Sequence, residues 1–190
     1  DYGKAEIWTA YGYSKDKQML EDLKSSDYHR KVAAQANDKP ESEVTPDERR
    51  DAKAITFGVM YAIGEKSLGE SLDKPTHVAR GYIKSFFKRF SDYDKFYKNI
   101  RQQVRETGVF QTITGRKRRF IPLGTDIRIL KQAVNFPIQS TSGDMTQLAM
   151  IKLDKPIRAL GGRIWFQVHD SIVLHIPKAK FDECIQLIHD

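Results

Sequence analysis

The sequence predicts a mainly helical α+β fold that contains a small antiparallel sheet. Most of the chain places apolar residues at helical spacing, and the clearest helix start is Thr45-Pro46-Asp47-Glu48. Two pairs of short segments rich in β-branched and aromatic residues flank turns at residues 114–117 and 169–171. Such pairs are typical of β-hairpins, so hairpins should supply the sheet and helices the rest.

The elements of the first half follow from local signals. Thr45 is a suitable N-cap, Pro46 suits the first helical position, and Glu48 completes a capping box. The helix that starts there should run to about Ile63. The polar residues 36–43 should form a loop. Further helices are expected at residues 5–13, 28–35, 76–90 and 92–107.

The second half should contain two hairpins separated by a long helix. The expected strands are residues 110–113 and 118–121, then 163–168 and 172–176. The helix between the hairpins, residues 128–153, contains Pro137, which would bend it. A last helix begins near Ala179. Because the chain starts on Asp1 and ends inside this helix, we expect a piece of a longer protein.

Composition limits the functional classes. The 190 residues carry a formal net charge of +7, which suits a polyanionic partner such as nucleic acid but also fits an ordinary soluble basic protein. The single cysteine, Cys184, excludes an internal disulfide and a cysteine-based zinc site. No signal peptide and no apolar stretch of membrane-spanning length is visible, so we expect a cytoplasmic protein.

One face of the helix that starts at Thr45 combines cations and aromatic rings. Arg49, Lys53, Phe57 and Tyr61 are spaced by four residues and therefore share a face. Cations near a helix N-terminus oppose the macrodipole, which makes sense if they and the helix end hold an anion such as a triphosphate. A solvated basic turn followed by ordinary core aromatics would give the same spacing.

Two carboxylates stand where they could bind a metal ion. Asp1 precedes a helical segment, and Asp170 lies at the tip of the second expected hairpin. A rigid turn fixes the oxygens of an aspartate, and two such groups could hold Mg²⁺ for phosphoryl transfer. Aspartate is also a common turn residue without any further role.

The combination of these segments resembles the family A DNA polymerases. Asp1-Tyr2-Gly3-Lys4-Ala5-Glu6 resembles motif A, whose pattern is Asp-Tyr-Ser-Gln-Ile-Glu. Residues 49–61 resemble motif B, and Gln167-Val168-His169-Asp170 resembles motif C. Residues 114–118 and 135–144 also resemble family signatures, and all five segments occur in family order.

The resemblance implies a catalytic centre with two Mg²⁺ ions. Asp1 and Asp170 match the two metal-binding aspartates, and the main-chain carbonyl of Tyr2 matches a further metal ligand. Lys53 matches a residue that grips the triphosphate and is expected to take part in catalysis. The implied reaction is template-directed addition of deoxynucleoside triphosphates to a primer 3′-OH.

The resemblance also implies sites for the nucleotide and the DNA. Arg49 and His29 match triphosphate contacts, Phe57 matches the position that packs on the sugar, and Tyr61 matches the aromatic residue that stacks at the templating site. Glu6 matches the gate that excludes ribonucleotides and is expected to be held by a hydrogen bond from Tyr61. The implied partners are primer–template DNA and deoxynucleoside triphosphates, with no membrane and no identified processivity factor. The residues expected to contact DNA are Arg116, Lys117, Arg118, Lys131, Asn135, Gln139 and His169.

In family terms, the fold is an antiparallel palm sheet with a mainly helical fingers subdomain. The expected layout is a palm segment at 1–35, fingers at 36–108 and a second palm segment at 109–190. The family's thumb and upstream regions have no counterpart in these residues, so the chain alone should not polymerise.

Four positions depart from the family pattern. Ser171 replaces the glutamate after the motif C aspartate, and Ala62 replaces the glycine after the motif B tyrosine. Lys131 stands where an arginine is common, and Trp8 replaces another arginine. These changes bear on rate and fidelity more than on the type of reaction.

Two other classes of protein remain alternatives. A metal-dependent nuclease would use the same carboxylates without needing the face from Arg49 to Tyr61, and a nucleotide-binding assay separates it. A non-catalytic basic module would bind duplex without Mg²⁺ and would tolerate the loss of Asp1 or Asp170.

Overall fold

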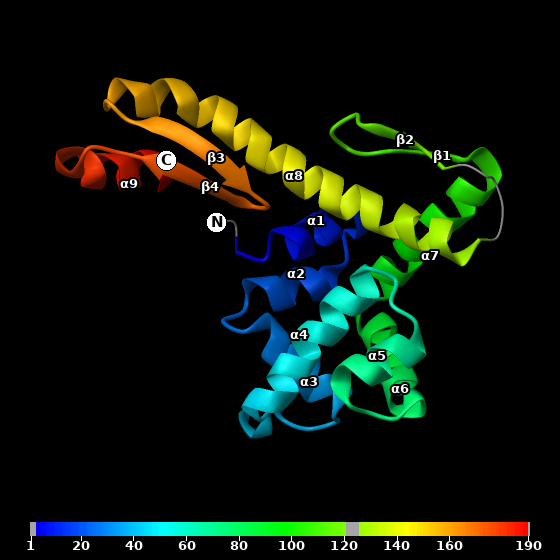
Figure 1. Cartoon of the computed structure of the whole chain (residues 1–190). Coiled ribbons are helices and arrows are strands. Elements are labelled where there is room, and N and C mark those ends of the chain that lie inside the picture. Colours follow the sequence, from blue (N-terminus) through cyan, green and yellow to red (C-terminus); the bar gives the residue numbers. More distant parts are fainter. Residues whose placement is uncertain (1–2, 121–125, 190) are drawn as a thin grey trace.

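The computed structural model describes residues 3–120 and 126–189, so Asp1, Tyr2 and Ile121 lie outside the described residues. The first part of the chain is a bundle of short helices, as expected (Figure 1). These helices are α1 (Ala5–Ser14), α2 (Lys17–Lys24), α3 (Tyr28–Ala36), α4 (Pro46–Met60), α5 (Glu65–Leu72), α6 (Thr76–Arg89) and α7 (Ser91–Thr107). Two of them, α2 and α5, were not predicted from the sequence.

The second part of the chain is built on one long helix, α8, which covers Ile127–Ala159 and crosses the molecule above α1 (Figure 1). The helix assignment continues through Pro137 and Pro156. Antiparallel two-stranded sheets precede and follow it, which confirms the α+β fold. Their strands are β1 (Val109–Gln111), β2 (Lys117–Arg119), β3 (Arg163–Val168) and β4 (Ser171–His175), and α9 (Phe181–His189) comes last.

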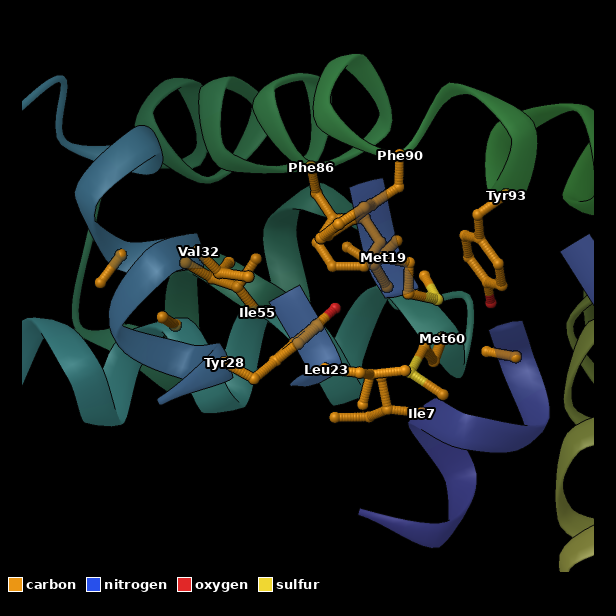
Figure 2. Close-up of a cluster of buried hydrophobic side chains, with 14 of the residues drawn as sticks. Ile7, Met19, Leu23, Tyr28, Val32, Ile55, Met60, Phe86, Phe90 and Tyr93 are labelled. Carbon is orange, nitrogen blue, oxygen red and sulfur yellow. The ribbon is translucent and has the colours of Figure 1, made fainter. Parts of the chain in front are cut away.

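The main hydrophobic core lies within the helical bundle. It joins side chains from α1 to α6 and continues into α7 and α8. Tyr28 stacks on Phe90 with 5.9 Å between ring centroids, and Phe86 packs edge-on against the same ring at 4.9 Å (Figure 2). Burying aromatic rings of this size contributes much of the free energy of folding. This core gives α1 and α4 a fixed relative position.

The N-terminus of α4 confirms the predicted capping box. The Thr45 hydroxyl accepts a hydrogen bond from the Glu48 backbone N–H, and the Glu48 carboxylate accepts one from Thr45 N–H. The C-terminus differs from the prediction, because α4 ends at Met60 and not at Ile63. Ala62 has a left-handed backbone with φ 54°, which stops the helix and costs about 1 kcal/mol for a residue with a Cβ atom.

Asp16 joins two helix N-termini. One carboxylate oxygen accepts the Met19 N–H and caps α2, at 2.9 Å. The other accepts the Asp92 and Tyr93 N–H groups in the first turn of α7, at 2.9 and 3.3 Å. Asp16 is only 2% exposed, so these bonds replace its hydration. The residue therefore holds the start of α7 against the corner between α1 and α2.

Asp22 forms the second buried carboxylate network of the bundle. It is fully buried and receives two hydrogen bonds from the Arg89 guanidinium, at 2.6 and 2.7 Å. Gln18 donates a third, and Arg89 also donates to the Gln35 side chain. A bidentate pair of this kind fixes α2 against the end of α6.

The C-terminal hairpin is packed less completely. Its strands pair from Arg163 with His175 to Val168 with Ser171, and an irregularity of register falls between Ile164 and Phe166. Several large apolar side chains of this hairpin and of α9 are about half exposed or more: Trp165, Phe166 and Val168 in β3, and Phe181 and Ile188 in α9. Among the described residues, no helix combines the length and the apolar character that crossing a membrane requires.

Candidate active site

A cleft of about 710 Å³ opens where α1, the end of α4, the middle of α8 and the β3–β4 turn meet. In Figure 1 the tip of the β3–β4 hairpin points toward α1 beneath α8. Segments far apart in the sequence therefore share one site. The cleft is lined by Lys4, Ala5, Glu6, Phe57, Tyr61, Gln139, Ser142, Gly143, His169 and Asp170. Six of these ten residues were predicted as site residues from the sequence: Glu6, Phe57, Tyr61, Gln139, His169 and Asp170.

A hydrogen bond between Tyr61 and Glu6 connects α4 to α1 across the cleft. The Tyr61 hydroxyl donates to the Glu6 carboxylate at 2.5 Å, although 55 residues separate them in the sequence. Burial raises the pKa of Tyr61 to about 12, and the Glu6 carboxylate adds to this while Gln139 acts against it. Tyr61 therefore stays protonated at neutral pH and holds Glu6 in one orientation.

The α4 face has the exposure that a ligand site needs. Ile55, Val59 and Met60 are buried, whereas Lys53 is exposed and Phe57 and Tyr61 are half-buried in the cleft wall. Phe57 and Tyr61 are thus less buried than the core residues of the same helix, and both line the cleft. The face is cationic and open at its start and aromatic toward the cleft.

Arg49 is held in place by a carboxylate of the neighbouring helix. Its Nε lies 2.6 Å from Asp27, which also caps α3 through the Arg30 N–H. Burial alone would raise the pKa of Asp27, but the hydrogen bonds from Arg49 and Arg30 outweigh it, so the pKa is lowered. Arg49 thus has a fixed position while more than a third of its side chain remains open to solvent.

His29 is nearly buried beside this cationic face. It is 8% exposed, its Nδ1 has no hydrogen-bond partner among the described residues, and its ring lies 6.2 Å from that of Phe57. Burial lowers the pKa of His29 to about 4, and the charges of Arg49, Lys53 and Lys4 add to this against the opposing Asp27. His29 is therefore neutral at physiological pH.

Asp170 lies at the turn between β3 and β4. The preceding His169 has a left-handed backbone, φ 54°, and its carbonyl accepts a hydrogen bond from the Gln167 side chain at 2.6 Å. Asp170 is half-buried and has no ion pair within the described part of the chain. Over residues 3–120 and 126–189, no three His, Cys, Asp or Glu side chains cluster as a metal site. The predicted partners Asp1 and Tyr2 fall outside these ranges.

Some of the residues predicted to contact DNA already form ion pairs or hydrogen bonds within the protein, and others form few. Arg116 forms an ion pair with Asp144 of α8, and Thr114 also donates to that carboxylate. Arg118 lies over the rings of Phe120 and Phe136 and donates to Gln132. These bonds fix the first hairpin along α8.

The other predicted DNA contacts have fewer partners. Lys117 is exposed at the start of β2, and Lys131 is half-buried on α8. Asn135 has a buried Oδ1 without a hydrogen-bond partner in the described residues. Gln139 is exposed and lines the cleft.

Sequence reasoning missed two residues of this region. Lys4 lines the cleft but was given no role, and Asp144 was part of a motif without an assigned partner. For Lys4, the signal was a lysine at a position where the motif A pattern has glutamine. No local signal could have found the pair of Arg116 with Asp144, which lie 28 residues apart.

A cleft lined by aromatic rings and carboxylates, at the end of a helix face that begins with cations, has the features of a site for a phosphorylated nucleotide. Comparison with known proteins identifies the family. The family model described as DNA polymerase family A matches residues 1–190. The chain belongs to this family.

Relatives of known identity agree with the assignment. DNA polymerase I of Lactococcus lactis is 30% identical over 99% of the chain, and the thermostable DNA polymerase I of Thermus aquaticus is 29% identical over 98%. The chain covers 22% and 23% of these proteins, so it spans less than a quarter of their length.

A solved structure shows the same fold. The POL domain of Pol1 from M. smegmatis, in complex with DNA primer-template and dNTP, matches with a TM-score of 0.90 at 30% identity. The match covers 99% of this chain and 35% of that one.

Proposed function

We propose that this chain forms the nucleotide-binding and catalytic centre of an enzyme that extends a DNA primer along a template. The supporting observation is the cleft, which collects side chains from three separate motifs: Glu6, then Phe57 and Tyr61, then His169 and Asp170. The relatives are named DNA polymerase I, and the structural match holds primer–template and dNTP. The reaction is attack of a primer 3′-OH on the α-phosphorus, with pyrophosphate leaving.

The cleft contributes one described ligand to the proposed pair of Mg²⁺ ions. Asp170 offers a carboxylate without an ion pair among the described residues, and Mg²⁺ prefers carboxylate oxygens. Asp1, Asp170 and the Tyr2 carbonyl would hold the ions, which supply activation of the attacking hydroxyl and neutralisation of the leaving group.

The phosphates of the nucleotide would lie along the start of α4. Arg49 and Lys53 would bind them, and the position of Arg49 is set in advance by Asp27. His29 is neutral, so it would donate a hydrogen bond without adding charge. Since none of these groups contacts the base, they would bind all four deoxynucleotides alike.

The sugar and base would occupy the aromatic end of the same face. Phe57 would pack on the sugar, and Tyr61 would stand at the templating site. Glu6, held by the Tyr61 hydroxyl at 2.5 Å, would occupy the space that a ribose 2′-hydroxyl needs. Gln139, Asn135 and Lys131 on α8 would follow the DNA.

The first hairpin and His169 would complete the DNA contacts. Lys117 is free to reach a phosphate, while Arg116 and Arg118 would contact DNA from the positions that Asp144 and Phe136 give them. In this proposal residues 1–35 and 109–190 are palm and 36–108 are fingers. Tyr28 and Val32, at the end of the first palm segment, pack in one core with the side chains of α4 and α6 in the fingers.

The replacement Asp170→Asn in the full-length protein tests this function. Primer extension should fall on the order of 10³-fold or more, because a metal ligand is lost, while gel-shift affinity for primer–template stays within about twofold. Asp154→Asn is the control, since Asp154 pairs with Arg158 on the exposed side of α8. Near-normal extension by Asp170→Asn would reject the assignment.

A further inference from the structure

Lys4 is a charged residue of the cleft to which neither the family motifs nor the proposed function gives a role. It precedes α1 and lines the same cleft as Glu6, Tyr61 and Asp170. The structure gives its side chain no hydrogen bond or ion pair within residues 3–120 and 126–189. The only acidic side chain next to it on α1, Glu6, is already bound by Tyr61. An ammonium group is thus present in the cleft without a bonded counter-ion in the described structure.

Fold stability does not account for a lysine here. Lys4 has a left-handed backbone, φ 62°, which costs about 1 kcal/mol for a residue other than glycine. Its positive charge also stands at the N-terminus of α1, where the helix dipole disfavours a cation. Both local effects disfavour a lysine at this position. The positive charge of Lys4 is therefore expected to interact with a ligand that is absent from the free protein.

The charge of Lys4 acts on the same place as those of Arg49 and Lys53. All three side chains lower the proton affinity of His29, although Lys4 belongs to α1 and the other two belong to α4. Asp27, the carboxylate beside them, is already bonded to Arg49 and Arg30. A phosphate chain bound in this region would therefore be attracted by cations from both helices.

We propose that Lys4 is a further nucleotide-binding residue, whose ammonium contacts the phosphate chain of the incoming nucleotide from α1, while Arg49 and Lys53 contact it from α4. The inference rests on the proposed function and adds a contact to it. Glutamine stands at this position in the motif A pattern, so Lys4→Gln removes the charge with a side chain that suits the segment. The contact is electrostatic and does not read the base.

The test uses the full-length protein and three variants. Lys4→Gln removes the charge and Lys4→Arg keeps it. Lys15→Gln is the matched control, because Lys15 ends the same helix, also has a left-handed backbone (φ 54°), and is exposed away from the cleft lining. Deoxynucleotide Kd is measured on a dideoxy-terminated primer, which separates binding from chemistry. Inhibition by inorganic pyrophosphate and primer–template affinity are measured beside it.

Lys4→Gln should raise the Kd of all four deoxynucleotides about tenfold, the size expected for one lost charge-assisted hydrogen bond. Inhibition by pyrophosphate should weaken in parallel, while Lys4→Arg and Lys15→Gln stay within about twofold of wild type. The melting temperature of Lys4→Gln should not fall, because both local effects at this position oppose lysine.

Three results would overturn the inference. Unchanged nucleotide binding by Lys4→Gln would show that the ammonium does not contact the nucleotide. A loss confined to primer–template affinity would place Lys4 on the DNA instead. Equal losses in Lys4→Gln and Lys4→Arg would mean a distorted α1. A wild-type protein that extends no primer would instead reject the proposed function, so the two failures are distinguishable.

Discussion

Buried acidic residues in the helical bundle and acidic residues around the cleft have opposite surroundings. Asp16 and Asp22 are fully bonded inside the bundle, to helix N–H groups and to Arg89 respectively. At the cleft, Asp170 has no ion pair in the described structure, and His29 keeps a buried nitrogen without a partner there. The difference teaches that the buried carboxylates of the bundle are bonded within the fold, whereas Asp170 is left without an ion pair in the described structure, as a carboxylate that binds a ligand would be.

The largest effect should come from the bundle side of this comparison. Asp22→Ala leaves the Arg89 guanidinium partly buried without its carboxylate, which should cost about 3–5 kcal/mol locally. Hydrogen exchange of α2 and α6 in the full-length protein would measure the loss as faster exchange of those amides.

A double variant separates lost pairing from lost volume. Asp22→Leu with Arg89→Met removes both charges and should recover much of the protection. Asp154→Ala, which breaks only a solvent-exposed pair, should change little. If Asp22→Ala also changes little, the network does not stabilise the bundle.

A pH effect of intermediate size should come from His29, which lies where the two regions meet. Its pKa is about 4 in the folded protein and 6.5 in an unfolded chain, so between these values only the unfolded state takes up the proton. Stability from this group is therefore complete above pH 6.5 and decreases as the pH falls toward 4, by on the order of 3 kcal/mol.

Chemical denaturation of wild type and His29→Gln across this pH range measures the effect. The free energy of unfolding of the variant should depend less on pH by that amount, because the remaining histidines are common to both proteins. Parallel curves for the two proteins would mean that His29 is not held neutral by the fold.

The smallest effect on free energy should appear at the cleft, as a change in selectivity. Glu6→Ala removes the side chain that Tyr61 holds and that we propose stands over the sugar, so the preference for deoxynucleotides over ribonucleotides should fall about tenfold or more. The measurement is the ratio of kcat/KM values for the two sugars. Glu21→Ala, on the exposed side of α2, is the control. An unchanged ratio would remove the gate role and leave the rest of the site in place.

Local chemistry explains how much of the fold was predictable. The capping box at Thr45 and Glu48 and the alternation around the two turns are signals of neighbouring residues, and both gave correct elements. The helix α5 was missed because Gly69 stands in its interior, a residue type that lowers helical propensity. Gly69 is there because a Cβ atom would lie 2.7 Å from the Lys74 carbonyl, which is a tertiary reason.

The candidate site was predictable where short sequence motifs identify its residues, and unpredictable where it depends on tertiary contacts. The family resemblance indicated Glu6, Tyr61 and Asp170, and the expected hydrogen bond from Tyr61 to Glu6 is confirmed. The pair of Arg116 with Asp144 depends on how a hairpin lies along α8, which no local pattern encodes. The roles of Asp1 and Tyr2 stay predictions.

The shared cap at Asp16 has a consequence for the order of events during synthesis. Its bond to Met19 can form as soon as α2 emerges, whereas its bonds to Asp92 and Tyr93 join groups 76 and 77 residues apart. Contacts of such separation close a long loop and carry its entropic cost. On the ribosome, one oxygen of this carboxylate therefore lacks its α7 partners until the chain has been made as far as Tyr93. The start of α7 then completes the bundle.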